Sequence, residues 1–414
     1  MLLTLTLAAT TSQAHNTLAS APLRVTFGEG RKGGTKVGKP RWKDERLQLT
    51  GRQPGKFTYD EIESLEDPFP PTPAHARQLR LEYAKRVAKG KTAKAAASLG
   101  TWAFRRGLFA EAKASFERAL ELNPAQASAR AALGQLKDGA GWQATADLIR
   151  AERAALAQRG LKTKAFLKEL CKLSRKAARN GEPALALELL IQGIRTDYSH
   201  KQARKQLKPL TDRYVHHVEL SSPLRGRWKA SEDVTRHHQL GPSAIYALDL
   251  VKVDVSGDHF EEGGRFRLNR HYAYGQPFYA AAPGRVGMVR EGHPDLPIGK
   301  LGPSDTSNLV AIDHGQGEWT WYVHAQPKSI VVKEGQQVTR GQLLGKVGNS
   351  GKSSISIPHL HFALSLQGMV SVPWRLRDFK LIAPDGTKIP VTQACPREGW
   401  IFEVAEPAAP APEK

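Results

Sequence analysis

The chain has few cysteines and no long apolar run. Cys171 and Cys395 are its only cysteines among 414 residues, and they lie in regions of different composition. A disulfide framework and a cysteine-based metal site are therefore not expected, so any metal would be held by His and carboxylate. Outside the amino-terminus, no stretch approaches the roughly 20 apolar residues that cross a bilayer. This predicts a mature chain without a transmembrane segment.

Acidic residues are scarce relative to basic ones. Lys and Arg number 61 against 40 Asp and Glu, which gives a net charge of +21. Such an excess favours polyanionic partners, namely nucleic acid, anionic envelope polymers or a membrane surface, or else it serves solubility alone. No zinc finger or other nucleic-acid motif accompanies the charge, so nucleic-acid binding is not expected. The length predicts two or three domains.

The two ends of the chain differ from its middle. The amino-terminus, MLLTLTLAATTSQAHN, joins an apolar run to a small-x-small pattern at Ser12-Gln13-Ala14, although a positive n-region is missing. It predicts a signal peptide over residues 1–14 and export to the periplasm or cell envelope. Residues 15–75 are rich in Gly, Pro, Lys and Arg and predict a basic, loosely structured leader. Residues 401–414 predict a solvated Pro/Ala-rich tail.

Residues 76–210 follow a helical period. The stretch LGTWAFRRGLFAEAKASFERALELNP predicts two helices joined by a Gly-containing turn, and it resembles a tetratricopeptide repeat. A weaker copy is KAFLKELCKLSRKAARNGEPALALELLIQGIRTD. The resemblance implies a small helical solenoid that binds a protein partner, and a plain helical bundle is the alternative. The matching positions are Leu99, Gly100, Ala112, Phe116, Ala119 and Pro124, followed by Leu173, Ala186 and Leu190 in the weaker copy.

Residues 212–400 change to short β-rich runs punctuated by Gly, Pro and Asn. One of these runs, PHLHFAL at 358–364, places two histidines one residue apart. Since side chains at i and i+2 of a strand point the same way, His359 and His361 would share one face, and Leu360 and Phe362 the other. Paired imidazoles on a strand suit a metal or proton-transfer site. The alternative is an ordinary amphipathic strand.

Four segments in order resemble the lysostaphin/LytM-type zinc endopeptidases, which cleave peptide bonds in bacterial cell-wall peptidoglycan. They are YGQPFYAAAPGRV, WYVHAQP, VVKEGQQVTRGQLLGKVGNSG and PHLHFAL. The resemblance covers roughly residues 220 to 380. It implies a mostly antiparallel β peptidase domain after the helical repeats, so the expected fold class is α+β with several domains.

The resemblance also implies roles for individual residues. Asp249 in YALDLV and His361 would bind Zn²⁺, while His324 and His359 would line the reacting centre. The chemistry agrees, because a zinc-bound water has a pKa lowered to about 7 and a nearby imidazole can take and return its proton. A second imidazole can hydrogen-bond the oxyanion. Which histidine performs which task stays open.

One position departs from this pattern. The family places a histidine four residues before the aspartate, where this chain has Ile245. The missing ligand would come from His238 or His237, with Gly241-Pro242 turning the chain towards Asp249. The alternative is a catalytically degenerate scaffold that binds the cell wall or activates another hydrolase.

Overall fold

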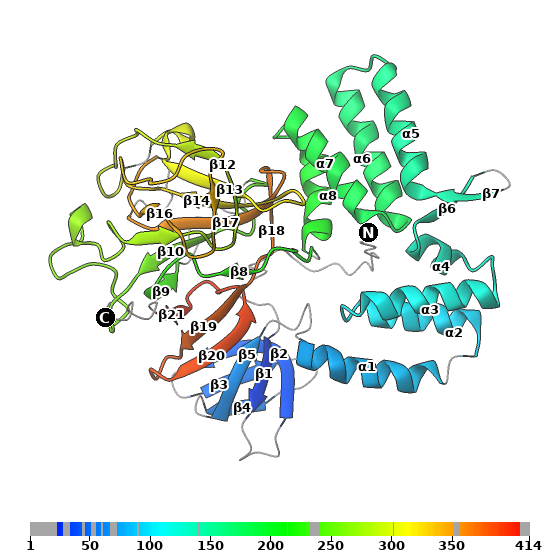
Figure 1. The fold of residues 1–414 in the computed structure, drawn as a ribbon, viewed down its shortest axis with the longest axis horizontal. Coiled ribbons are helices and arrows are strands. Elements are labelled where there is room, and N and C mark those ends of the chain that lie inside the picture. Colours follow the sequence, from blue (N-terminus) through cyan, green and yellow to red (C-terminus); the bar gives the residue numbers. More distant parts are fainter. Residues whose placement is uncertain are drawn as a thin grey trace, which may run out of the picture. The chain divides into compact units, whose positions relative to one another are not determined.

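The chain divides into two compact units, each described here by itself. The computed structural model describes residues 23–27, 34–43, 46–50, 55–58, 61–66, 73–88, 91–138, 141–212, 214–231, 241–300, 302–351 and 357–405. The helical unit spans Pro68–Tyr214, and the β unit joins Ala14–Asp67 to Val215–Lys414. The helices therefore form an insertion between two parts of the β unit (Figure 1).

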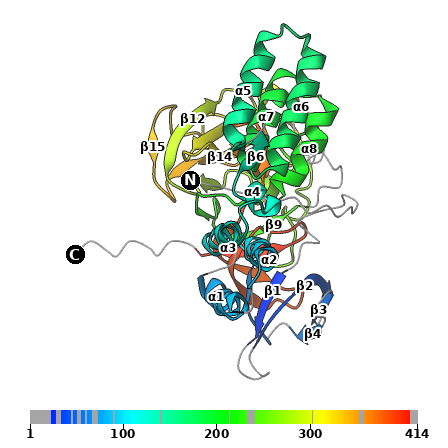
Figure 2. The same cartoon turned by 90° about the vertical axis from the view of Figure 1, so that its right-hand side faces the viewer.

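The described part of the helical unit contains helices and one small hairpin. The helices are α1 (Pro73–Val87), α2 (Ala93–Phe104), α3 (Phe109–Leu122), α4 (Ala127–Ala132), α5 (Thr145–Gln158), α6 (Thr163–Arg179), α7 (Pro183–Thr196) and α8 (Lys201–Thr211). The hairpin consists of β6 (Gln135–Asp138) and β7 (Gly141–Ala144). Helices α5 to α8 pack side by side, as Figure 2 shows.

Small residues let the helices of this unit approach closely. A Cβ added at Gly100 on α2 would lie 2.8 Å from the ring of Phe116 on α3. Ala112 and Ala119 are also buried there, and α3 ends just before Asn123-Pro124. Small residues therefore line the contact between α2 and α3. The stretch after Leu133-Gly134 forms the β6–β7 hairpin instead of a further helical repeat, so the tetratricopeptide assignment stays a prediction.

The β unit contains short strands along both of its segments. Its first segment holds β1 (Leu23–Phe27), β2 (Gly34–Lys43), β3 (Arg46–Thr50), β4 (Gly55–Thr58) and β5 (Ile62–Glu66). Its second begins with β8 (Leu220–Ser221), β9 (Gly226–Ala230), β10 (Leu248–Lys252), β11 (Pro277–Tyr279), β12 (Gly284–Arg290), β13 (Leu309–Asp313) and β14 (Glu318–Val323). It continues with β15 (Gln337–Val338), β16 (Leu343–Lys346), β17 (Leu360–Leu366), β18 (Val370–Val372), β19 (Leu376–Ile382), β20 (Lys388–Ala394) and β21 (Ile401–Val404). Two 3₁₀ turns, η3 (Leu268–Arg270) and η4 (Ser304–Thr306), interrupt the loops.

An antiparallel sheet in the order β9–β10–β17–β14–β13–β12–β15 forms the framework of the β unit. In strand β17, which lies between β10 and β14, Leu360, Phe362 and Leu364 are fully buried as PHLHFAL predicts, and Ala363 and Ser365 on the other face are also buried. Phe362 packs against Tyr322 and Trp374. The predicted fold class, helices followed by a mostly antiparallel β domain, is confirmed.

The expected loosely structured leader is wrong for the described residues between 23 and 66. They form β1 to β5, and β5 pairs in parallel with β20 from the other end of the chain. Alternation within LRVTF and IESLE buries Val25 and Leu65 completely, a short-period signal that the surrounding Lys, Arg and Gly obscure. The expected tail is likewise wrong for Ile401–Val404, which pair with β9 and β19.

The described residues can be examined for a membrane-spanning helix and for a disulfide between the two cysteines. No helix in the described ranges is long and apolar enough to cross a membrane. Cys171 and Cys395 are both buried, lie in different units and are not joined by a disulfide. The predicted signal peptide lies outside the described residues.

Candidate functional site

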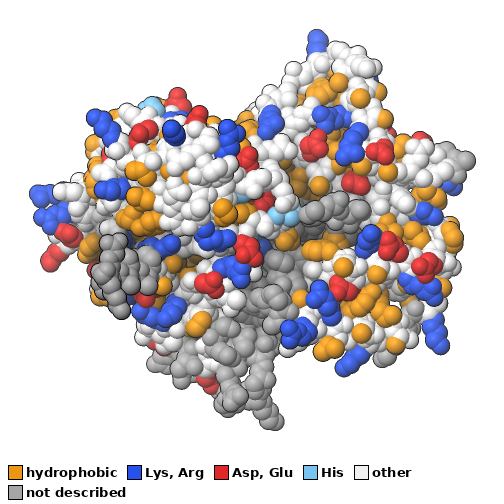
Figure 3. All heavy atoms as spheres, viewed as in Figure 1, with side chains coloured by type: hydrophobic (Ala, Val, Ile, Leu, Met, Phe, Trp, Pro, Cys, Tyr) orange, Lys and Arg blue, Asp and Glu red, His pale blue; other side chains and the backbone are white. Residues whose placement is uncertain are grey.

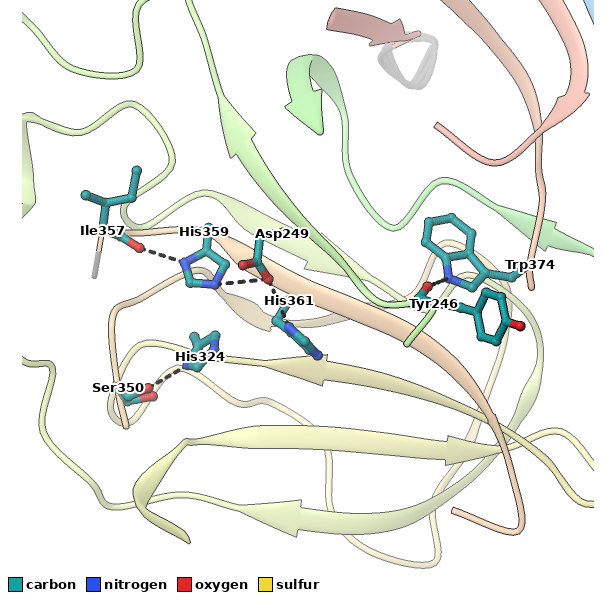
Figure 4. Close-up of polar contacts among 8 residues, drawn as sticks. All are labelled: Tyr246, Asp249, His324, Ser350, Ile357, His359, His361 and Trp374. Atoms are coloured by element: carbon teal, nitrogen blue, oxygen red, sulfur yellow. Dashed lines mark hydrogen bonds and ion pairs between the residues drawn. The ribbon is translucent and has the colours of Figure 1, made fainter. Parts of the chain in front are cut away.

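The candidate site begins with a carboxylate and an imidazole on neighbouring strands. Asp249 of β10 stands directly opposite His361 of β17 in the antiparallel register. Asp249 is only 2% exposed, and its Oδ1 lies 2.9 Å from Nδ1 of His361. A carboxylate accepts hydrogen bonds but cannot donate them, so Nδ1 of His361 carries the hydrogen in this arrangement. Figure 4 shows the two side chains pointing towards each other.

His359 approaches the same carboxylate oxygen from just before β17. Its Nδ1 donates to the Ile357 carbonyl at 2.6 Å, which leaves Nε2 with the lone pair. This Nε2 is buried, lies 3.4 Å from Oδ1 of Asp249 and has no hydrogen-bond partner among the described residues. Two imidazole nitrogens therefore converge on one buried oxygen, as expected for side chains at i and i+2.

His324 completes the cluster from the end of β14. Its Nδ1 donates to the Ser350 carbonyl at 2.7 Å, which again leaves Nε2 with the lone pair. The ring centroid lies 4.6 Å from that of His359 and 6.0 Å from that of His361. Burial holds the pKa of His324 well below its usual value, and the two neighbouring imidazoles lower it further. The ring is therefore neutral at neutral pH and able to accept a proton.

The backbone at His324 is held in a conformation that few non-glycine residues adopt. Its φ is +71°, in the left-handed region. The Oγ of Ser350 donates to the Ala325 carbonyl at 2.9 Å and accepts from the Asn308 amide at 3.0 Å. The Asn308 side chain donates to the carbonyls of Ala325 and His293. These buried contacts fix the turn that carries His324.

Sequence reasoning did not find this support for His324. Ser350 lies within the segment VVKEGQQVTRGQLLGKVGNSG and Asn308 directly precedes a β-rich run, but neither position indicates a contact with the turn at His324. A glycine signal was present, since a Cβ at Gly351 would lie 2.1 Å from Oγ of Ser307. Such close backbone approach requires glycine. The sequence does not reveal which segments approach there.

Tyr322 lies on the face of the sheet opposite the cluster. It pairs with Phe362 in the register, is fully buried and accepts a hydrogen bond from the Ala281 amide through its hydroxyl. Burial raises its pKa to about 12. Strand alternation would place Tyr322 on the same face as His324, but the positive φ of His324 breaks the alternation. Tyr322 therefore packs the sheet and does not line the site.

The segment before Asp249 supplies no ligand at the position where a histidine was expected. Residues 242–246 form turns, so Ile245 precedes β10 and is half-buried. The neighbouring Tyr246 is buried, and its carbonyl accepts a 2.7 Å hydrogen bond from the Trp374 indole. Figure 4 shows this pair well away from the three imidazoles.

A catalytic zinc ion in a protein takes three protein ligands and one water. Asp249 and His361 fit two of these places, because a carboxylate oxygen and an imidazole nitrogen already converge there. The described residues contain no group of three His, Cys, Asp or Glu side chains that could hold a metal ion. His237 and His238 lie in the 232–240 stretch, outside the described residues. The described donors therefore fit a zinc site only in part.

Comparison with known proteins finds a match to the region that contains the three histidines. The sequence profile of peptidase family M23 matches residues 268–373, which contain His324, His359 and His361. The chain is also 34% identical over 101 residues to the lipoprotein NlpD of Yersinia enterocolitica, a match that spans 24% of this chain and 89% of that protein.

The chain belongs to peptidase family M23. Another relative is the peptidoglycan DD-endopeptidase ShyA of Vibrio cholerae, which is 38% identical over 94 residues. That match spans 23% of this M23 chain and 18% of ShyA, so the chain covers less than a fifth of this relative's length. A solved zinc-containing peptidase from Vibrio cholerae aligns with 34% of this chain and 40% of its own, with 23% identity and a TM-score of 0.20.

The M23 match leaves one part of the site untested. It starts at residue 268, after both Ile245 and Asp249. The resemblance at the first metal motif therefore rests on Asp249 alone, and this is the part of the site where the chain departs from the expected pattern.

Proposed function

We propose that this M23 chain is a zinc-dependent endopeptidase that hydrolyses peptide bonds in bacterial peptidoglycan. The observation that carries the proposal is the convergence of His361 and His359 on the buried Asp249 carboxylate. The peptidoglycan substrate is supported by the endopeptidase ShyA among the relatives. An exported location, in the periplasm or cell envelope, is supported by the relatives that are lipoproteins.

In the proposed site, Asp249 and His361 would hold the zinc with a third ligand from His238 or His237. A neutral imidazole would hold the metal through the ring nitrogen that carries no hydrogen, and in this structure the Nδ1 of His361 directs its hydrogen towards Asp249. When bound, zinc lowers the pKa of a water molecule and polarises the scissile carbonyl.

The remaining two histidines would move the protons. Each has its Nδ1 hydrogen fixed on a backbone carbonyl, that of Ser350 for His324 and that of Ile357 for His359. Each therefore presents Nε2 as a proton acceptor. One of them would take the proton of the attacking water and return it to the leaving amine, while the other stabilises the oxyanion. The assignment between the two stays open.

The metal content of the full chain tests this proposal. Purified protein should contain one zinc per chain and cleave the peptide crosslinks of isolated peptidoglycan. Asp249→Ala should lose both the zinc and this activity. His238→Ala and His237→Ala identify the third ligand, because only the true ligand's variant loses the metal. Asp385→Asn, at an exposed turn of the same unit, is the matched control and should keep both. A folded wild-type chain that takes up no zinc would contradict the proposal.

A second candidate function is a cell-wall-binding or hydrolase-activating scaffold without catalysis. Ile245 at the position where the family has a histidine ligand favours it. A scaffold would bind isolated peptidoglycan or raise another hydrolase's rate with no zinc present. In either case we propose that the helical unit docks a protein partner, as its resemblance to tetratricopeptide repeats suggests.

A further inference from the structure

The net charge of the chain is divided unevenly between its units. Residues 68–214 contain 29 Lys and Arg against 12 Asp and Glu, a net charge of +17. The rest of the chain contains 32 against 28, a net charge of +4. The helical unit therefore carries most of the positive charge, although Figure 3 shows acidic side chains interspersed among the basic ones on the face in view.

Helix α6 concentrates this charge along one side. Five of its basic residues are spaced by three or four positions and so lie on one helix face. All five are exposed, and over the 1.5 Å rise per residue they form a row about 22 Å long. This row, called the α6 basic row below, consists of Lys164, Lys168, Lys172, Arg175 and Arg179.

Little negative charge neutralises the row. Glu169 is the only acidic residue of α6, and it accepts a 2.6 Å hydrogen bond from Lys172. That hydrogen bond is the main cause that lowers the pKa of Glu169, and the nearby charges of Arg159 and Lys168 act in the same direction. The other four members of the row form no ion pair with any described residue. The off-row Lys176 instead pairs with Glu152 of α5.

The neighbouring helix α8, which α6 contacts directly, adds further basic residues. Lys201 and Lys205 are exposed opposite its buried residues, whereas Lys208 is half-buried and pairs with Asp212 at 2.6 Å. Most apolar side chains of α6, among them Leu167 and Leu170, are buried inside the unit, while Phe166 is half-buried and only the small Ala165 is exposed. Insertion of α6 into a membrane interface requires an exposed apolar face, and the described helix has only cations on its exposed row. The row therefore fits a hydrated anionic polymer better than a lipid surface.

We propose that the α6 basic row binds the carboxylates of peptidoglycan stem peptides and holds the chain on its polymeric substrate. The proposal rests on the proposed peptidoglycan substrate. Stem peptides repeat along the polymer, so several exposed cations can engage several carboxylates at once. Each contact is weak at physiological salt, and their sum retains the chain near the site of cleavage.

Co-sedimentation of the full chain with insoluble peptidoglycan tests this inference. The test variant is Lys168→Glu/Arg175→Glu/Arg179→Glu. The matched control, Lys300→Glu/Lys333→Glu/Lys380→Glu, changes the net charge equally at exposed positions of the β unit. At about 0.1 M salt we expect binding to fall roughly tenfold in the test variant and less than about twofold in the control, because local rather than net charge directs the contact. Added salt should remove much of the difference.

The outcomes separate this inference from the proposed function. Equal losses in the two variants would overturn it in favour of a general charge effect. A test variant that keeps peptidoglycan binding but loses binding to vesicles containing phosphatidylglycerol would overturn it in favour of a lipid surface. Zinc content and cleavage of a short soluble crosslinked peptide should be the same in the test variant as in wild type. If the wild type neither binds zinc nor cleaves, sedimentation still decides the inference.

Discussion

In the β unit the polar groups of the site are buried and held by individual hydrogen bonds, whereas in the helical unit the charged groups lie exposed along helix faces. Asp249, His324 and His359 are each less than 5% exposed, while every member of the α6 basic row is exposed. A buried group with a fixed partner cannot be replaced by a neighbour or by water. An exposed charge is one of many whose weak contributions to binding add up. The units should therefore differ in how much a single substitution costs.

The largest effect is expected from the two proton-transfer candidates. His324→Gln and His359→Gln should each lower the turnover of peptidoglycan by about 10²–10⁴-fold, the usual contribution of a positioned acid or base. Zinc content should stay at the wild-type level, since neither residue is a proposed ligand. Turnover and metal analysis on the same preparations give the result. Loss of zinc in His359→Gln would instead make that residue a ligand.

Asn308 tests the support beneath His324. It is fully buried and its side chain bonds the backbone at His293 and Ala325. Asn308→Ala should lower the free energy of unfolding by roughly 1–3 kcal/mol, because buried partners are left unsatisfied. Asn308→Asp keeps the accepted hydrogen bond and loses the two donated ones, so its turnover of peptidoglycan should be lower than that of the wild type. Denaturant unfolding that changes by less than about 0.5 kcal/mol would contradict this reading of the network.

In the helical unit the corresponding test is the contact between two helices. Gly100→Ala places a methyl group against the Phe116 ring, and overpacking of this kind costs about 1–3 kcal/mol of stability. Gly141→Ala is the control, because a Cβ there meets nothing within 4 Å. Thermal unfolding of both variants measures the difference, and zinc content should not change in either. Equal melting temperatures would mean that Phe116 moves aside freely.

The smallest effect is expected at a surface ion pair of the helical unit. Arg153 on α5 and Glu188 on α7 lie 2.7 Å apart, with both side chains exposed by more than a third. Glu188→Gln should lower the free energy of unfolding by less than about 1 kcal/mol, as exposed pairs usually do. A loss above about 2 kcal/mol in denaturant unfolding would show that the helical unit also depends on single polar contacts.

Residues close together in sequence predicted the strand faces, but they did not predict the contacts between distant segments. The alternation in PHLHFAL predicted that Leu360 and Phe362 share the face opposite the two histidines, and the resemblance gave Asp249 and His361 a common site, where the register places them directly opposite each other. The bonds from Ser350 and Asn308 to the turn at His324 join segments far apart in sequence, and no local pattern encodes such contacts. The β5–β20 pairing was missed for the same reason, because its partners come from opposite ends of the chain.

That pairing has a consequence for how the protein is made. Ile62–Glu66 leave the ribosome long before Lys388–Ala394 exist, so the first strands spend most of translation without one of their neighbours. Contacts between residues this distant in sequence are slow to form, and an unpaired strand edge invites association with other chains in the meantime. An excised fragment limited to the M23 match would keep the three histidines but lose Asp249 and both of these strands.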